Sequence, residues 1–468
     1  MSAKPSNIEA LEKGPILPLL LQYSLPAIAG LVVMSLYNII DSIFIGHWIG
    51  AKGLAGTAIA FPVMNLGAAV GTLVGIGGGV ATSIFLGQKC FFDARRVLGQ
   101  VFVLAFLTGI FVSSLALFFL EDILRLFGAS EEVLPYAYDF MFPQLLGQTL
   151  TYYFFNLNHV MRASGYPVKA MCSLLISAVF NVVLAPLFLY WGWGIQGVAW
   201  ATVISQFLGA IWVTAHFLNK NHIVFFSRGI YALKWSLVRH ICFVGLPPSV
   251  MNMVGCLVII IINWQLKLHG GDIAIAANGI FNRCVMLNAF CVIGISQGAQ
   301  PIIGFNYGAN KVERVRKTLF GALVLGTFIA TSFGLFCVAF PRTVAACFTQ
   351  DEILLDVGAE AMRWGTLALP LVGFQIIIVH FFQSIGKAHL SVVLSFTRQA
   401  FFLIPALLVF PRFWNTMGVW LAFPFADFIA SVLAISLILW FLAGYKTSNH
   451  ADLVKQKLLS ADKNDENA

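Results

Sequence analysis

Apolar residues fill twelve long stretches of the chain, separated by short polar or charged segments. A helix that crosses a bilayer needs about 20 mostly apolar residues, and each stretch reaches that length. The pattern predicts an all-α integral membrane protein with twelve transmembrane helices, at 16–45, 57–86, 97–120, 135–160, 168–191, 196–219, 241–267, 274–304, 318–341, 357–383, 389–411 and 416–444.

The composition agrees with this pattern and excludes several classes of protein. Of the 468 residues, 59% are hydrophobic and 10% are charged, whereas soluble domains carry about 25% charged residues. The eight cysteines are scattered through apolar runs without paired spacing, so we interpret them as small core residues rather than metal ligands or disulfides. The sequence shows no motif for enzyme chemistry, and we expect no cofactor and no metal site.

The placement of lysine and arginine predicts the orientation. If the N-terminus is cytoplasmic, 20 of the 28 Lys and Arg residues fall on the cytoplasmic side and five outside, while Arg283, Arg363 and Arg398 lie within spans. Such an excess marks the cytoplasmic side of membrane proteins. Both termini are therefore predicted to be cytoplasmic. The net charge of +8 then needs no nucleic-acid partner.

The chain also repeats itself. A shift of 221 residues, without gaps, aligns Leu25-Pro26 with Leu246-Pro247 and Arg95 with Arg316. Because each half has an even number of spans, six, both halves enter the membrane from the same side. They are therefore parallel repeats, related by an axis along the membrane normal. We expect two pseudo-two-fold-related six-helix lobes around a central cleft. The predicted organisation is an N-lobe at 1–219, a cytoplasmic linker at 220–240, a C-lobe at 241–445 and a disordered cytoplasmic tail at 446–468.

Ionisable residues inside a span are costly and therefore mark candidate sites. Asp41 has Asn38 and Tyr37 three and four residues before it, so the three share one helical face. A carboxylate in a partly dry pocket can exchange a proton for an oxygen-preferring cation. The repeat places Ile262 opposite Asp41, which makes the lobes chemically unequal. Hydration of Asp41 near the outer end of its span is the alternative.

Three segments carry a family resemblance: LYNIIDSIFIGHWIGAKGLAGTAIAFPVMNL, LNHVMRASGYPVKAM and FFQSIGKAHLSVVLSFTRQAFFLIPALLVFP. They resemble the multidrug and toxic compound extrusion (MATE) family of the bacterial type, over nearly the whole chain. The resemblance implies a secondary antiporter in the cell inner membrane that exports organic cations, often aromatic, in exchange for H⁺ or Na⁺.

In the family, an Asp of the first span works with polar residues of spans 5 and 6, and the resemblance assigns these roles to Asn181 and Thr202. The usual span 5 string reads Asn-x-x-Leu-Asp-Pro, but this chain has Ala185 in place of the Asp. With one of the two carboxylates missing, the identity of the coupling ion, H⁺ or Na⁺, is not determined by the resemblance. The loss favours protonation of Asp41 over a multidentate Na⁺ site.

A second group of charges lies near mid-membrane in the C-lobe. Asp427 and Arg398 reach similar depths in spans 12 and 11, and Arg283 reaches that depth in span 8. We hypothesise a charge network of these three residues. The alternative is a purely structural buried ion pair.

Polar and aromatic residues in the N-lobe spans are candidates for the substrate cavity, where aromatic rings would hold a cation and Met would adapt to varied shapes. Packing between helices is the alternative for each. The candidates are Met64, Asn65, Gln148, Tyr152, Tyr153, Asn156 and Gln206.

Two other functions are alternatives to drug export. A lipid-linked oligosaccharide flippase of the same superfamily would need several deep cationic residues, and only Arg283 and Arg398 qualify. A channel or receptor is disfavoured because the sequence shows no filter-like loop and no appended soluble domain. The internal two-fold predicts that a monomer suffices.

Overall fold

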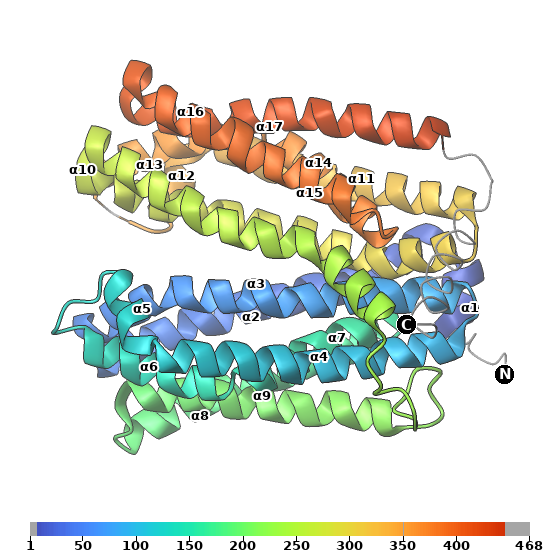
Figure 1. Cartoon of the computed structure of the whole chain (residues 1–468). Helices are drawn as coiled ribbons and strands as arrows, with labels where there is room; N and C mark the ends of the chain where they lie inside the picture. The colour runs from blue at the N-terminus through green and yellow to red at the C-terminus, as the bar shows by residue number, and fades with distance from the viewer. Residues whose placement is uncertain (1–6, 350, 445–468) are drawn as a thin grey trace.

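The computed structural model describes residues 7–349 and 351–444, and its regular structure within them is helical throughout. The predicted tail at 446–468 lies outside the described residues. Two groups of helices stack on each other, the blue-to-green N-lobe below and the yellow-to-red C-lobe above (Figure 1). We call the end of the bundle that holds α1 (Asn7–Lys13) the α1 end, and the other the far end.

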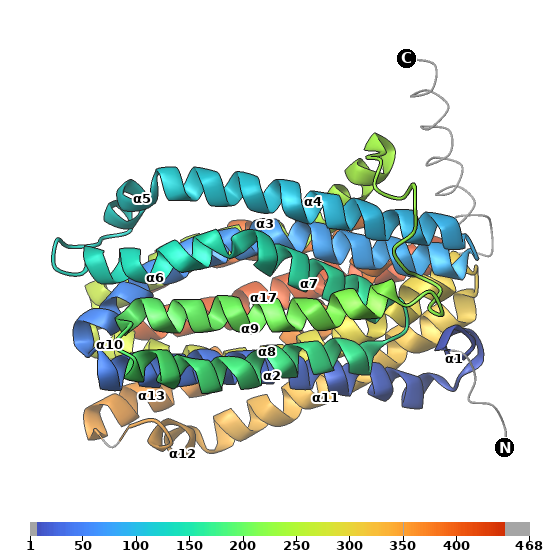
Figure 2. The same cartoon turned by 90° about the horizontal axis from the view of Figure 1, so that it is seen from below.

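The N-lobe consists of six traverses between the two ends, seen side by side in Figure 2. The short helix α5 (Leu120–Leu126) lies at the far end. The traverses are α2 (Ile16–Trp48), α3 (Ala51–Gly87), α4 (Phe91–Phe118), α6 (Leu134–Leu146) continued by α7 (Gln148–Ala163), α8 (Pro167–Tyr190) and α9 (Gly194–Leu218).

The C-lobe repeats this order. Its elements are α10 (Trp235–Gly308), α11 (Val312–Ala339), α12 (Pro341–Ala346), α13 (Glu352–Gly365), α14 (Leu369–Ser384), α15 (Ala388–Phe396), the π-helical turn η1 (Thr397–Leu403), α16 (Ile404–Val409) and α17 (Pro411–Gly444).

The long segment α10 contains two spans. Its backbone leaves the helical region at Gly271 (φ 64°, ψ −159°), where the chain turns back at the left of Figure 1. The amide Nδ2 of Asn278 lies 3.5 Å from Oδ1 of Asn263, which is possible only if the two arms run antiparallel. The first arm begins at Trp235, inside the predicted linker, because Leu237 and its neighbours already bury apolar side chains.

By length and composition, nine of the described helices could cross a membrane, or ten if the bent pair α13 and α14 is one span. The two arms of α10 add one more. The traverse α6 plus α7 adds another, which composition alone overlooks because α7 is rich in polar residues. The twelve-helix, two-lobe arrangement is confirmed.

The internal repeat is visible in the backbone. Residues with positive φ recur at the 221-residue offset, and non-glycine residues adopt this conformation only where the fold imposes it. The pairs are Gly50 (88°) with Gly271 (64°), Lys89 (60°) with Asn310 (56°), Gly165 (99°) with Gly386 (74°), and Gly194 (57°) with Asn415 (49°).

Glycines bring the two lobes into backbone contact in the half near the α1 end. A Cβ at Gly77 of α3 would lie 1.9 Å from the carbonyl oxygen of Ile241 in α10. The same crossing recurs at the 221-residue offset, where a Cβ at Gly298 would lie 2.6 Å from the backbone nitrogen of Ser24 in α2. Small residues let helices approach this closely within a membrane.

The buried core shows where the lobes separate. One large cluster joins both lobes and includes Val74 and Leu98 from the N-lobe and Ile241 and Ile303 from the C-lobe. Towards the far end, however, the N-lobe and the C-lobe each have a separate cluster. The faces of α2, α3 and α10 that meet near the α1 end carry exposed side chains further along, so the lobes leave a cleft at the far end. These side chains include Ile39 (52% exposed), Leu66 (37%) and Leu287 (49%).

The segments that precede the two lobes are exchanged between them. Helix α1 comes before the N-lobe but is held by the C-lobe, where Arg314 donates to the carbonyl of Gly14 (2.8 Å) and Lys311 pairs with Glu12 (3.0 Å). The Lys311 ammonium holds the pKa of Glu12 below its usual range. The segment before α10 is held by the N-lobe, through Gln100 Nε2 and the carbonyl of Ala232 (2.8 Å).

Candidate functional site

Asp41 lies inside the N-lobe, where α2 packs against α8 and α9. Its side chain is buried, and the amide Nδ2 of Asn181 in α8 lies 3.4 Å from its Oδ2 and 3.1 Å from the hydroxyl of Thr202 in α9. The structure thus brings together the three residues that the sequence assigned to three different spans. The neighbouring Ala185 is fully buried, so this chain supplies no second carboxylate there.

Two oxygens of this site lack hydrogen-bond partners among the described residues. They are Oδ1 of Asp41 and Oδ1 of Asn181, and both atoms are buried. A buried oxygen without a partner is costly. Each of these oxygens is free to accept a hydrogen bond or to contact a cation.

The other two residues predicted for cation coupling lie at the edge of the site. Asn38 is exposed and donates its amide to the carbonyl of Met34 one turn earlier (2.7 Å). Tyr37 is half-buried, and no hydrogen bond joins its hydroxyl to Asp41. Their participation in coupling stays a prediction.

In the C-lobe, Arg398 and Asp427 form the predicted ion pair. Nε of Arg398 lies 2.6 Å from Oδ1 of Asp427, and the carboxylate side chain is only 4% exposed. Arg398 lies in the π-helical turn η1, a type of distortion that is frequent at functional sites. Arg283, however, does not join this pair, so the predicted three-residue network is wrong. Its side chain is exposed and makes no hydrogen bond or ion pair with Arg398 or Asp427.

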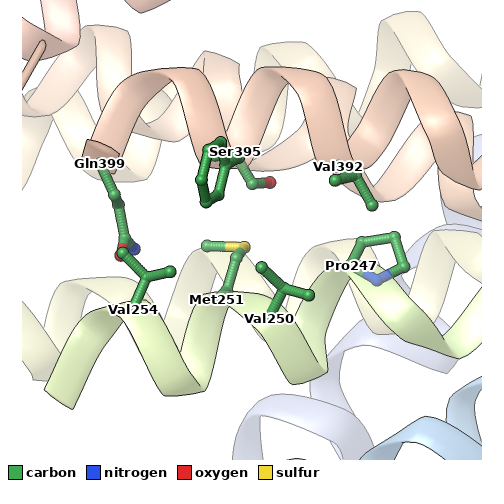
Figure 3. Close-up of a pocket in the computed structure, with 8 residues that line it drawn as sticks. Pro247, Val250, Met251, Val254, Val392, Ser395 and Gln399 are labelled. Carbon is green, nitrogen blue, oxygen red and sulfur yellow. The ribbon is translucent and has the colours of Figure 1, made fainter. Parts of the chain in front are cut away.

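A narrow crevice without room for a water molecule lies between the first arm of α10 and the α15–η1 segment (Figure 3). Gln399 points towards Val254 across it (Figure 3), and the side-chain oxygens of Ser395 and Gln399 have no hydrogen-bond partner among the described residues. In the N-lobe, the repeat places Gly30 and Leu174 at the positions of Met251 and Ser395. There the two helices pack closely instead, since a Cβ at Gly30 would lie 2.7 Å from Leu174.

Three substrate-cavity candidates of α6–α7 pack over glycines of α3. An added Cβ at Gly71 would lie 2.8 Å from the ring of Tyr152, and one at Gly75 would lie 2.5 Å from Oδ1 of Asn156. Gln148 lies over Gly67 in the same way. These side chains therefore fill the groove of a helix pair, and binding of substrate by them stays a prediction.

The remaining candidates are spread over the lobe. Gln206 accepts from Thr151 (2.5 Å) between α7 and α9. Tyr153 bonds Thr214 (2.6 Å) and contacts the rings of Phe102 and Phe106 on another face of α7. Met64 packs on the far-end core of the N-lobe and Asn65 is half-buried.

Arg162 was missed, because the sequence suggested only a basic residue after span 4. Its side chain is buried in the last turn of α7, donates across the lobe boundary to Gln297 of α10, and contacts Oδ1 of Asn158 (3.2 Å). The available signal was Gly165, which ends the helix only after Arg162 and so keeps this arginine inside it.

Comparison with known proteins agrees with this architecture. The MatE family model matches residues 26–187 and 247–408, two segments separated by the 221-residue offset. The multidrug export protein MepA of Staphylococcus aureus (strain N315) is 23% identical over 97% of this chain and all of its own length.

Solved structures show the same fold. The MATE multidrug transporter DinF-BH is 32% identical, with a TM-score of 0.85 over 94% of this chain and 98% of its own. An outward-facing multidrug resistance MATE family transporter of the MOP superfamily has a TM-score of 0.90 at 22% identity, over 95% and 100% of the two chains. The protein described here therefore belongs to the MATE family of membrane transporters.

Proposed function

We propose that this transporter is a secondary antiporter that exports organic cations, often aromatic, in exchange for H⁺ or Na⁺. The basic α1 end faces the cytoplasm, the far end faces outward, and the chain works as a monomer in the inner membrane. The relatives support export of multiple drugs, since two of them are named as multidrug transporters.

The observation that carries the proposal is the environment of Asp41. Its partners Asn181 and Thr202 are neutral, so the carboxylate can lose its charge without leaving a buried cation unpaired. The site offers few oxygens besides this carboxylate, because Ala185 occupies the position of the family's second Asp. This favours H⁺ over Na⁺ as the coupling ion.

Helix α2 connects this site with the boundary between the lobes. Asp41 faces α8 and α9, while Ser24 and Ile28, further towards the α1 end of the same helix, touch the glycines of α10. Pro26 interrupts the hydrogen-bond ladder of α2 near these contacts, and proline lets a helix bend. Protonation of Asp41 thus changes the packing of the helix that also closes the cleft, which gives the two conformations different affinities for the ion.

The test is efflux of a fluorescent organic cation from proteoliposomes, driven separately by a pH gradient and a Na⁺ gradient. We expect uphill export in the wild type and at least a tenfold loss in Asp41→Asn, which keeps the shape of the side chain but removes the titrating group. Asp139→Asn is the matched control, because Asp139 lies in the same lobe but bonds Gln196 outside this site.

Three results decide between the alternatives. Uphill export by either gradient identifies the coupling ion. Normal export by Asp41→Asn would remove Asp41 as the coupling residue. If neither gradient moves a cation through folded protein, drug export is wrong, and translocation of a lipid-linked oligosaccharide becomes the function to test.

A further inference from the structure

Arg283 is a cation in the membrane for which the described part of the chain supplies no counter-charge. Its side chain is exposed, and it makes no hydrogen bond or ion pair with any residue in the described part of the chain. Arg398, by contrast, is neutralised by Asp427. An unpaired guanidinium at membrane depth is strongly disfavoured unless it faces water or a ligand.

The register of α10 shows which way Arg283 points. Gly294 and Gly298, on the second arm, contact Ile28 and Ser24 of the N-lobe. Arg283 precedes Gly294 by eleven residues, about three helical turns, and no residue between them leaves the helical conformation. The two residues therefore share one face, and Arg283 borders the cleft between the lobes rather than the lipid.

The same count gives its depth. Arg283 lies about 16 Å from Gly294 towards the far end, and about 18 Å of helix from the turn at Gly271. This is near the middle of a hydrocarbon core that is about 30 Å thick, out of reach of the lipid headgroups.

The opposite wall of the cleft offers no anion at this level. On α2, Ile39 follows Ile28 by eleven residues and is 52% exposed, so an apolar side chain faces the guanidinium. Asp41 points to the other side of α2, into its site with Asn181. The repeat equivalent of Arg283 in the N-lobe is Pro62. The C-lobe wall of the cleft therefore carries a positive charge at this position and the N-lobe wall does not.

We propose that Arg283 binds an anionic group of the substrate, such as a carboxylate, and so selects compounds that carry both a cationic centre and an acid. This inference rests on the proposed export function. A guanidinium holds a carboxylate through two parallel hydrogen bonds, and more strongly in a site shielded from water. A purely cationic compound gains nothing from Arg283 and is repelled by it.

A matched pair of dyes tests the proposal: a rhodamine with a free benzoate and the methyl ester of the same rhodamine. Near neutral pH the first carries both charges and the second only the cation. Binding is measured by fluorescence anisotropy on purified protein, and export in proteoliposomes, for wild type, Arg283→Gln and Arg283→Lys.

We expect the wild type to bind the free acid more tightly than the ester, and Arg283→Gln to weaken free-acid binding about tenfold, or 1.4 kcal/mol. Ester binding should stay constant or improve, and Arg283→Lys should restore part of the preference. Arg342→Gln, at the far-end surface where Arg342 pairs with Glu352 (3.0 Å), controls for loss of a positive charge elsewhere.

The outcomes separate this inference from the function it rests on. If Arg283→Gln weakens the binding of both dyes equally, or of neither, Arg283 is not an anion-binding residue. Export of the ester would then still support the proposed export function. If the wild type binds and exports neither dye, the export function fails and this inference fails with it.

Discussion

The two lobes share one backbone and differ in their chemistry. At the 221-residue offset, the polar group of Asp41, Asn181 and Thr202 in the N-lobe corresponds to Ile262, Phe402 and Phe423 in the C-lobe, all apolar. The comparison thus places a hydrogen-bonded acid in one lobe where the other has a hydrophobic core.

The C-lobe ion pair shows the reverse. Arg398 and Asp427 (2.6 Å) correspond to Ser177 and Gln206 in the N-lobe, one turn away from Asn181 and Thr202. Asp41 has only neutral partners and can change its charge. Asp427, by contrast, is paired with the permanent cation Arg398. The difference teaches that the repeat preserves the backbone of the two lobes but not the chemistry of their buried polar groups, which is why the proposed coupling site lies in the N-lobe.

The largest effect that we predict is a difference in lost stability between variants at two equivalent positions, Asp427 in the C-lobe and Gln206 in the N-lobe. Asp427→Ala leaves the partly buried Arg398 (22% exposed) without a counter-charge and should cost about 3 kcal/mol. Gln206→Ala removes a neutral hydrogen bond with Thr151 and should cost about 1 kcal/mol. Thermal unfolding in detergent, monitored by size-exclusion chromatography, measures the loss of stability in both variants.

The charge-reversed double variant, Arg398→Asp with Asp427→Arg, is the control for this prediction. It should recover much of the stability that either single reversal loses, because it restores an ion pair in the same place. Equal losses in Asp427→Ala and Gln206→Ala would contradict the distinction between the lobes.

The second prediction sharpens the part of the comparison in which the lobes are alike. A Cβ at Gly77 or at its equivalent Gly298 would collide with the other lobe, so Gly77→Ala and Gly298→Ala should each disfavour closure at the α1 end by about 1–3 kcal/mol. Distances between spin labels placed across the α1 end should increase in both variants.

Gly279→Ala is the matched control, because a Cβ there meets nothing within 4 Å. Its distances should match the wild type. A shift in only one of the two interface variants would show that the crossings do not carry equal parts of the closed state.

Hydropathy and the repeat were sufficient to predict the twelve spans and the two lobes, whereas the grouping of Asp41 with Asn181 and Thr202 came from the family resemblance. Hydropathy reports how deep a residue lies, and the repeat reports which helices correspond. Neither reports where a side chain points around its helix. For this reason Arg283 was grouped with Arg398 and Asp427 at similar depth, although it faces the cleft.

Arg162 illustrates a second gap. A basic residue at a span end is indistinguishable, in sequence, from one in a loop, and only tertiary packing decides that Arg162 reaches Gln297 in the other lobe. The sequence predicts a central cleft but does not show which residues line it, since exposed apolar residues such as Ile39 resemble lipid-facing ones.

The smallest predicted effect concerns the exchanged end segments. Glu12 of α1 pairs with Lys311 of the C-lobe (3.0 Å), whereas the repeat equivalent of Lys311 is Cys90, so this tie exists once. Because Lys311 lowers the pKa of Glu12, the pair stabilises the fold when the carboxylate is charged, above the ordinary glutamate pKa of about 4.3. That stability is lost as the pH falls through the lowered pKa.

Glu12→Gln should therefore lower the melting temperature slightly at neutral pH and leave it unchanged in acid, where the wild-type carboxyl is protonated as well. Glu9→Gln is the control, because Glu9 contacts Lys13 within α1 itself (3.4 Å) and does not bridge to the C-lobe through that contact. A Glu12→Gln deficit that persisted in acid would mean that the side chain acts through packing and not through its charge.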